Sequence, residues 1–441
     1  MAIQTQRLAV QIVIRRTPPT SPRAALASLC LATLMSSLGT SIANVALPTL
    51  AQSFAATFAQ VQWVVLAYLL ANTTFVVSVG RLGDIVGRRL LLLVGIALFI
   101  IASMACGLTH FLWALIAARA VQGVGAATML ALSMALIGDT FPKERAGSTI
   151  GLLGTMTAIG TALGPSLGGV LIAVFGWRAL FFINVPLGVV TFVLAYRTLP
   201  DDHALVVAEL RVHAPLTPLS LFRDVTLRTP LVLIVLVSSV MMTTLVVGPF
   251  YLARTLMLNA AMVGVTMSVG PIVAALISVP AGRIADRFGS RHVTLAGLCG
   301  VAVGAMALAL LPTSTGVVGY LLPISVMTAG YAVFQTANNT VLMTNVSRDR
   351  RGAIAGLLNL ARNLGLISGA SAMGAVFAHA SRSADITAGS ATSVAAGMHV
   401  TFAVAATLMF GALVIGVRGH TRETFADSES DSPSRLSISN C

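Results

Sequence analysis

The sequence contains few charged residues. Asp, Glu, Lys and Arg make up 9% of the 441 residues, whereas hydrophobic residues make up 56%. Soluble domains carry about 25% charged residues. A chain of this length with so little charge cannot cover a globular surface with polar groups. The composition therefore indicates an integral membrane protein.

Cysteine is also scarce, and the motifs of several enzyme classes are missing. The four cysteines, at positions 30, 106, 299 and 441, have no spacing typical of a metal site or a disulfide framework. No glycine-rich stretch has the phosphate-binding spacing that ends in Gly-Lys-Ser/Thr, and no Ser-His-Asp arrangement stands out. We therefore expect no enzyme, no metal, no cofactor and no ATP-driven pump.

Long apolar runs dominate what is present. A helix that spans a bilayer needs about 20 mostly apolar residues. On this criterion we predict about twelve spans, which is an even number and places both termini on one side of the membrane. The spans are 24–47, 61–80, 90–108, 111–138, 148–174, 179–198, 230–252, 263–282, 292–312, 317–345, 352–378 and 396–417. The predicted fold class is an all-α polytopic membrane protein.

The positive charges orient these spans. In the predicted arrangement 22 of the 27 Lys and Arg residues fall on the side of the termini, which the positive-inside rule assigns to the cytoplasm. The net charge of +13 is therefore loop charge, and we expect no nucleic-acid partner. The predicted location is the bacterial inner membrane, with the spans in contact with the lipid bilayer.

The same pattern divides the chain into five segments. We expect a cytoplasmic arm at 1–23, a first six-helix bundle at 24–198, a polar cytoplasmic loop at 199–229 and a second bundle at 230–418. The last segment, 419–441, is rich in Ser, Asp and Glu and is predicted to be disordered.

The sequences of the two predicted bundles contain an internal repeat. The loop at 80–89 returns at 282–291, and its first glycine, its aspartate and its second glycine all keep an offset of 202 residues. Four glycines of the fifth span, at 151, 160, 164 and 169, align with glycines 356, 365, 369 and 374 at an offset of 205. Two homologous halves of parallel topology, related by pseudo-two-fold symmetry, are typical of a transporter.

Four local patterns now identify a family. They are the loop at 80–89, the fourth-span stretch at 115–127, the fifth-span stretch at 160–169, and the pair formed by 44–48 with 62–70. With them the chain resembles the major facilitator superfamily from about residue 30 to 417, and within it the drug:proton antiporters of the EmrB/QacA type. That branch usually has about fourteen spans, with an extra pair between the halves. Since 199–229 is too short and polar for such a pair, we expect a compact twelve-helix form.

The resemblance implies that the repeated loops latch the two halves together on the cytoplasmic side. Asp84 can face the positive end of another helix, and the glycines permit close approach and a tight turn. For the arginines, plain topogenic charge is an equally good interpretation. The predicted latch consists of Gly80, Asp84, Gly87, Arg88, Arg89, Gly282, Asp286, Gly289 and Arg291.

The fifth span carries the pattern that in the family marks antiporters rather than symporters or facilitators. Its residues are Gly160, Gly164, Pro165, Gly168 and Gly169. Glycines four apart give a smooth face for close helix packing, and a proline bends the helix. Ordinary packing would explain the glycines but not the proline between them, which the second half replaces by alanine at position 370.

Proton coupling is implied by the resemblance, but the carrier is not obvious. Relatives often have an aspartate in the first helix where this chain has Gly39, and none of the 14 acidic residues falls in the middle of a predicted span. A buried arginine normally faces the bundle interior, and Arg119 shares a helix face with Gln122. The candidates for coupling are Arg119, Asp84 and Asp139. The alternative for Arg119 is that it pins helices by bonding exposed carbonyls.

Polar side chains within spans predict a substrate cavity, because amides are costly in lipid. Hydrogen bonding between helices is the alternative for each. The set consists of Asn44, Tyr68, Gln122, Gln335, Asn338, Asn359, Arg362 and Asn363. Since the only charges in the middle of spans are Arg119 and Arg362, neutral or weakly acidic amphiphiles suit this cavity better than lipophilic cations.

The sequence thus predicts a secondary exporter of small, drug-like amphiphiles that works by alternating access in exchange for protons. We expect it to act as a monomer, with a periplasmic adaptor as a possible further partner. The alternatives are a proton-independent metabolite exporter or uniporter of the same fold, and a non-transporting membrane receptor.

Overall fold

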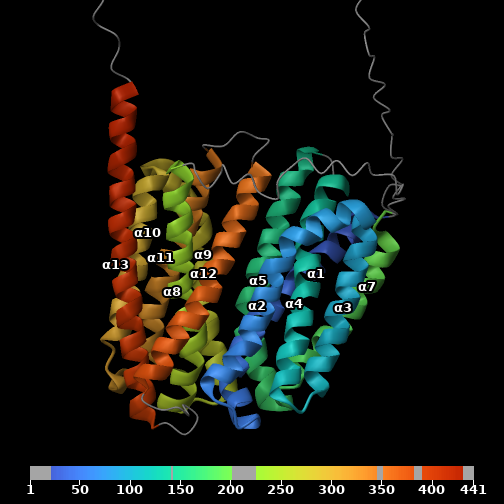
Figure 1. Ribbon diagram of the computed structural model, residues 1–441, viewed down its shortest axis with the longest axis horizontal. Helices are drawn as coiled ribbons and strands as arrows, with labels where there is room; N and C mark the ends of the chain where they lie inside the picture. The colour runs from blue at the N-terminus through green and yellow to red at the C-terminus, as the bar shows by residue number, and fades with distance from the viewer. Residues whose placement is uncertain (1–20, 141–142, 201–224, 345–350, 382–389, 431–441) are drawn as a thin grey trace, which may run out of the picture.

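The computed structural model describes residues 21–140, 143–200, 225–344, 351–381 and 390–430. In these segments the chain is helical and contains no strand (Figure 1). The elements are α1 (Pro22–Ser53), α2 (Phe58–Val86), α3 (Arg88–Leu108), α4 (Leu112–Thr140), α5 (Lys143–Phe175), α6 (Ala179–Phe182), α7 (Asn184–Thr198), α8 (Val225–Phe250), η2 (Tyr251–Thr255), α9 (Ala260–Phe288), α10 (Ser290–Ala309), η3 (Thr313–Thr315), α11 (Gly316–Thr344), α12 (Arg351–Ala380) and α13 (Ala391–Ser430).

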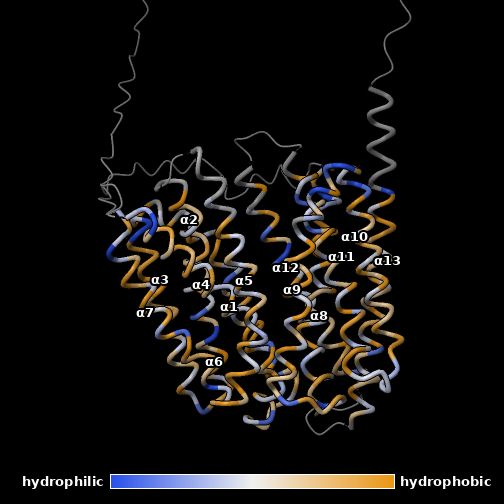
Figure 2. Tube along the Cα trace, turned by 180° about the vertical axis from the view of Figure 1, so that it is seen from behind, coloured by the Kyte–Doolittle hydropathy of each residue, from blue (hydrophilic) through white to orange (hydrophobic). Residues whose placement is uncertain are grey.

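The predicted fold class is confirmed. Each predicted span coincides with one long helix, or with the consecutive pair α6 and α7. In the described part of the chain, eleven helical stretches are long and apolar enough to cross a membrane. The helix left out is α12, which carries Asn359, Arg362 and Asn363. Large apolar side chains such as Ile101 and Leu322 are exposed, as a protein surrounded by lipid requires. Hydrophobic residues run along most of the length of the helices (Figure 2).

Two predicted boundaries differ from the structure. Helix α8 begins at Val225, five residues before the predicted start, and α13 continues to Ser430, well into the segment expected to be disordered (Figure 1). No proline or glycine occurs between 421 and 430, so nothing stops a helix that is already formed from propagating. Residues 1–20, 201–224 and 431–441, which contain the rest of the predicted arm, loop and tail, lie outside the described residues.

The repeated loop is a sharp corner between helices. Helix α2 ends at Val86 and α3 begins at Arg88, so Gly87 alone forms the connection, and Gly289 does the same between α9 and α10. Their φ angles are 106° and 84°, and residues other than glycine rarely adopt this region of backbone conformation. The second glycine of the repeat is therefore fixed by backbone geometry.

Within each half, glycines bring the fifth helix against the first. Carbon atoms added at Gly160 would lie 2.8 Å from the Leu34 carbonyl oxygen, and the Ser41 hydroxyl donates to the Gly160 carbonyl at 3.1 Å. In the second half Gly365 packs on α8 in the same way, and the Ser239 hydroxyl donates to its carbonyl at 2.9 Å. The sequence repeat is thus also a repeat of helix contacts.

The two halves meet through glycines at one end of the molecule. A carbon added at Gly264 of α9 would lie 2.8 Å from the Gly169 Cα of α5, and it would overlap the Pro165 carbonyl. A second contact between the halves joins α2 to α12, where the Gln62 amide donates to the Ala370 carbonyl. Both contacts lie toward the end where α5 finishes and α9 begins, which is opposite to the end of α13. We call it the closed end, and the other the terminus end.

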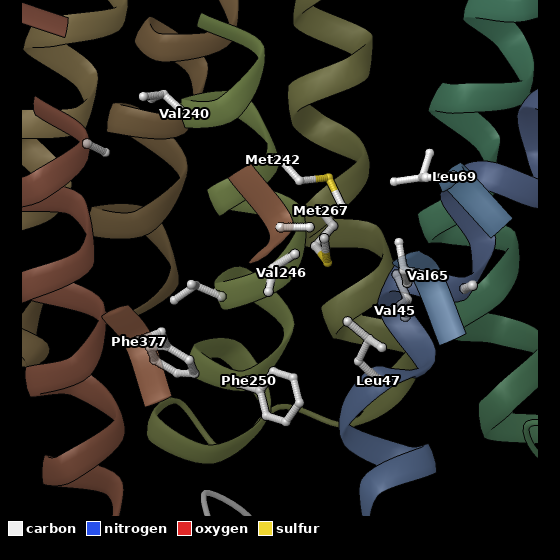
Figure 3. Close-up of a cluster of buried hydrophobic side chains, with 14 of the residues drawn as sticks. Val45, Leu47, Val65, Leu69, Val240, Met242, Val246, Phe250, Met267 and Phe377 are labelled. Atoms are coloured by element: carbon white, nitrogen blue, oxygen red, sulfur yellow. The ribbon is translucent and has the colours of Figure 1, made fainter. Parts of the chain in front are cut away.

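Aromatic and aliphatic side chains seal the closed end. The Phe58 ring lies 5.1 Å from the Phe250 ring and 5.3 Å from the Phe377 ring, joining α2, α8 and α12. Toward the middle of the helices the same buried cluster continues with side chains from both halves (Figure 3). They include Val45, Leu47, Val65, Leu69, Val240, Met242, Val246 and Met267.

We predict that Gly264→Ala loosens the closed end, because the added methyl group would overlap the backbone of α5. Spin labels on Phe111→Cys and Leu310→Cys, exposed sites in different halves at this end, should move apart by a few ångströms in a protein whose native cysteines are replaced by serine. Gly154→Ala in α5 is the control, since a carbon there has no neighbour within 4 Å. An unchanged label distance in Gly264→Ala would contradict the proposed packing.

Candidate functional site

Arg119 of α4 lies at the centre of a buried polar network in the first half. Its side chain is 0% exposed. It donates from Nε to the Val64 carbonyl at 3.0 Å, from Nη2 to the Gly39 carbonyl at 3.1 Å and from Nη1 to Gln122 Oε1 at 2.6 Å. Its guanidinium carbon lies 4.2 Å from the centre of the Tyr68 ring, a cation–π distance. Arg119 therefore ties α4 to α1 and α2.

The partners of Arg119 extend the network to α3. Gln122 Nε2 donates to the Ser103 hydroxyl at 2.7 Å, and the Tyr68 hydroxyl donates to the Ser36 carbonyl at 2.8 Å. Gln122 and Tyr68 are both 0% exposed. In this conformation both side chains are therefore buried against the arginine, and their place in the lining of a cavity stays a prediction. The alternative stated for Arg119, that it bonds exposed carbonyls, describes the observed contacts.

The contact with Gly39 explains how the network manages without a carboxylate. At position 39 this chain offers Arg119 a backbone carbonyl instead of a carboxylate. A carbon added at Gly39 would lie 3.1 Å from the Tyr68 hydroxyl and 3.2 Å from the Phe99 ring. The site is therefore filled, and the positive charge is stabilised by carbonyl oxygens, an amide and an aromatic face.

A second polar group lies in the second half and is only half-buried. The Gln335 amide is oriented with its oxygen toward α12. In this orientation the oxygen accepts from the Arg362 guanidinium, and the Nε and Nη1 atoms each lie 3.2 Å from it. The Gln335 nitrogen then donates to the Tyr331 hydroxyl at 3.0 Å. Sequence reasoning missed Tyr331, although its place one turn before Gln335 puts both on one face of α11. Asn359, one turn before Asn363 on α12, is also half-buried.

Other predicted cavity residues are buried between helices. Asn338 is 2% exposed and donates to the Pro230 carbonyl of α8 at 3.4 Å, as the helix-bonding alternative expected. Asn44 is 1% exposed and donates to the carbonyls of Thr40 and Ser41 in its own helix. Among the predicted cavity residues, those with accessible surface are therefore Gln335, Asn359 and Arg362, on α11 and α12 of the second half.

The fifth-helix glycines have two separate tasks. Gly160, Gly164 and Gly168 face α1, where carbons added at their positions would crowd residues of that helix. Gly169 faces α9, and so does the carbonyl of Pro165. The pattern therefore covers both the internal packing of the first half and its contact with the second.

The first repeated loop contacts its own half. Arg88 Nη1 donates to the Ala135 carbonyl of α4 at 3.4 Å, and Arg89 Nη2 donates to the Tyr196 carbonyl of α7 at 2.6 Å. A carbon added at Gly83 would lie 2.7 Å from a Leu132 methyl group, so Gly83 is the position of close approach.

The first glycine of each repeated loop has space for an added carbon atom. Gly80 was expected to permit close approach, but a carbon added there has no neighbour within 4 Å, and at Gly282 the nearest atom is a Thr336 methyl group at 3.8 Å. Asp286 is exposed. The side chains of Asp84 and Asp139 lie outside the described residues.

One titratable group lies deeper than expected. The predicted span 396–417 has His399 near its start, but α13 begins at Ala391, so the histidine lies about two turns inside the helix. Its Nε2 atom is buried and has no hydrogen-bond partner in the described part of the chain. His399 therefore joins the side chains that could carry a proton.

We predict that Arg119→Met destabilises the fold, because it removes three hydrogen bonds of a buried side chain and leaves the Gln122 oxygen without its donor. The expected loss is roughly 2–4 kcal/mol. It is measured as a lower midpoint of thermal unfolding in detergent. Arg254→Met, which removes a cation from the helix end η2, is the control. Equal midpoints for the two variants would show that the network contributes little.

Comparison with known proteins agrees with this architecture. The family described as Major Facilitator Superfamily matches residues 29–370. The chain is 26% identical over 399 residues to the riboflavin transporter RibZ of Clostridioides difficile, covering 80% of this chain and 88% of that protein. It is 29% identical over 370 residues to the multidrug resistance protein Stp of Mycobacterium tuberculosis, covering 72% and 68%. It is 29% identical over 373 residues to the drug efflux pump JefA of the same species, covering 72% and 73%.

Solved structures share the fold at low sequence identity. A bacterial homologue of the human lysosomal transporter Spinster, solved in an inward-facing and unoccupied conformation, superposes with a TM-score of 0.76 at 16% identity over 91% of this chain and 97% of that one. The nucleoside transporter NupG gives a TM-score of 0.72 at 14% identity over 90% and 99%. The chain is a multi-pass membrane transporter of small molecules and belongs to the major facilitator superfamily.

Proposed function

We propose that this protein exports small amphiphilic compounds by alternating access, in exchange for protons. The observation that carries the proposal is the arrangement of contacts between the halves. In the described part of the chain, the glycine, glutamine and phenylalanine contacts between the halves all lie toward the closed end. Two halves that are tied at one end can rock about a site between them.

The distribution of basic residues indicates which end of the molecule faces the cytoplasm. Basic residues gather at the terminus end, which the positive-inside rule assigns to the cytoplasm. The conformation is then inward-facing, sealed toward the periplasm and ready to receive substrate from the cytoplasm. In this state Arg88 and Arg89 of the first repeated loop donate to carbonyls of α4 and α7 in their own half.

Export, rather than import, is supported by the relatives and by the fifth helix. Stp and JefA are named as a multidrug resistance protein and a drug efflux pump, whereas RibZ is named as a riboflavin transporter. The pattern at 160–169 places Pro165 and Gly169 at the contact with α9, where the closed end must open to release substrate. Pro165 lies inside α5 at this contact, and a proline that removes a backbone hydrogen bond suits a gate.

A proton-independent carrier is the second candidate, and one observation favours it. Acidic residues in the described helices occur only near helix ends, at Asp84, Asp139, Glu144 and Asp286 and in the last eight residues of α13. Intramembrane proton relays are usually built from Asp, Glu or His. The side chains available for this role are therefore Asp84, Asp139 and His399, with Arg119 acting at most through its surroundings.

The test is proton movement in energised inside-out vesicles. A lipophilic cation and a neutral or anionic amphiphile are added separately to vesicles with a preformed pH gradient, and substrate flux is followed in parallel. We expect substrate to collapse part of the gradient. Of the three variants Asp84→Asn, Asp139→Asn and His399→Gln, the one that changes the proton-carrying residue should abolish that collapse. Vesicles without the protein give the background.

The outcomes separate the candidates. Gradient collapse together with substrate flux supports antiport. Substrate flux without collapse contradicts antiport and favours the proton-independent carrier. No flux of any probe contradicts the transport of amphiphiles.

A further inference from the structure

We propose that Arg362, Gln335 and Tyr331 form a subsite for the carboxylate, or a similar oxyanion, of an amphiphilic substrate. This inference rests on the proposed function, because it names the chemical class of substrate that the exporter takes. The carboxylate would bind the guanidinium of Arg362, while the apolar body of the substrate lies against the aliphatic side chains between the halves.

The guanidinium has unused capacity. It presents five N–H donors in a planar fork that matches a carboxylate. Within the described residues its one hydrogen-bonding partner is the single oxygen of the Gln335 amide. A neutral amide oxygen leaves the positive charge without a counter-charge, and a charge inside the membrane is normally paired or faces water.

The helices α10, α11 and α12 supply no counter-charge to Arg362. Arg362 lies 11 residues from the start of α12, about 16 Å along the axis. No Asp or Glu occurs between 287 and 348 or between 350 and 384, which covers α10, α11 and α12. An anion that pairs with Arg362 must therefore come from outside these helices, and a substrate is the natural source.

The position of Arg362 on its helix points to the interior. Arg362 reaches across to Gln335 of α11, whereas Leu364, which is 49% exposed, lies about 160° around α12 from Arg362. Ala370, whose carbonyl accepts from Gln62 at the closed end, lies about 12 Å further along the helix. The guanidinium is thus half-buried on the terminus side of the seal, where an inward-facing carrier admits its substrate.

The other arginine of the interior cannot do this. Arg119 is 0% exposed and already has three acceptors and an aromatic face. The two arginines therefore have different roles: one holds helices together, and the other offers donors. Gln335 can assist, because rotation of its amide would present N–H groups to an oxyanion while Tyr331 keeps the other end in place.

The experiment compares three probes with one apolar body: 4-butylbenzoate, 4-butylbenzamide and 4-butylbenzyltrimethylammonium. Equilibrium binding of radiolabelled probes is measured on the purified full chain in detergent, with no gradient present. We expect the benzoate to bind at least about tenfold more tightly than the other two. Arg362→Gln should remove this preference and leave the affinity for the benzamide within about twofold. Arg254→Gln, which removes a cation from the same half, should leave the preference unchanged.

A preference for benzoate that persists in Arg362→Gln would overturn the proposal, and so would a wild-type preference for the ammonium probe. If Arg362→Gln binds no probe, Arg362→Lys decides. A lysine keeps the charge but not the planar fork, so a smaller preference for benzoate supports the subsite, and equal binding of all three contradicts it. Because binding is measured without flux, an Arg362-dependent preference in a protein that exports nothing would contradict the proposed function alone.

Discussion

Close contact between helix backbones is the constraint on which the rest of this structure depends. In a bilayer the hydrophobic effect does not press helices together, so their association relies on close packing and hydrogen bonds. Glycines 160 and 164 in one half, and 365 and 369 in the other, let the fifth helix of each half reach the backbone of the first. One turn beyond these, Gly169 and Gly374 contact the opposite half. The same device thus builds each bundle and joins the two.

The absence of acidic residues from the middle of the described spans shapes the interior chemistry. A buried arginine without a carboxylate must find carbonyls, amides and ring faces, and Arg119 does so on α1, α2 and its own α4. Gln122 extends the network to α3, so four helices of the first half are joined. Arg362 has only an amide partner within the described residues and keeps donors available. The asymmetry between the halves therefore gives the first half a structural arginine and the second a candidate for recognition.

Much of the fold could be predicted from the sequence, because span length, charge bias and an internal repeat are each strong signals. The positive φ of Gly87 and Gly289 shows why the second glycine of the repeated loop recurs. Helix ends were harder to predict. Hydropathy marks the apolar part of a helix, but the helix continues past that part until a residue interrupts it. Helix α13, for example, extends to Ser430, beyond its predicted span.

The site could be predicted only in part. An amide or tyrosine inside a span signals an interior position, but it does not say whether the side chain faces another helix or the space between the halves. Tyr68 and Gln122 proved to be fully occupied by Arg119, whereas Gln335 and Arg362 kept accessible surface. That distinction depends on which carbonyls lie within reach of each side chain, and it appears only in three dimensions. The roles of Asp84 and Asp139 stay predictions.

The most direct test of the account is to lock the closed end and measure transport. Phe58 and Phe377 face one another there from different halves, with ring centres 5.3 Å apart. Cysteines at these two positions, in a protein without its native cysteines, would be joined by a short, reducible, bifunctional thiol reagent, and substrate flux would be followed in proteoliposomes. The account predicts that flux stops on cross-linking and returns on reduction, while the single-cysteine proteins are unaffected. Flux that continues through a cross-linked closed end would contradict alternating access between these two halves.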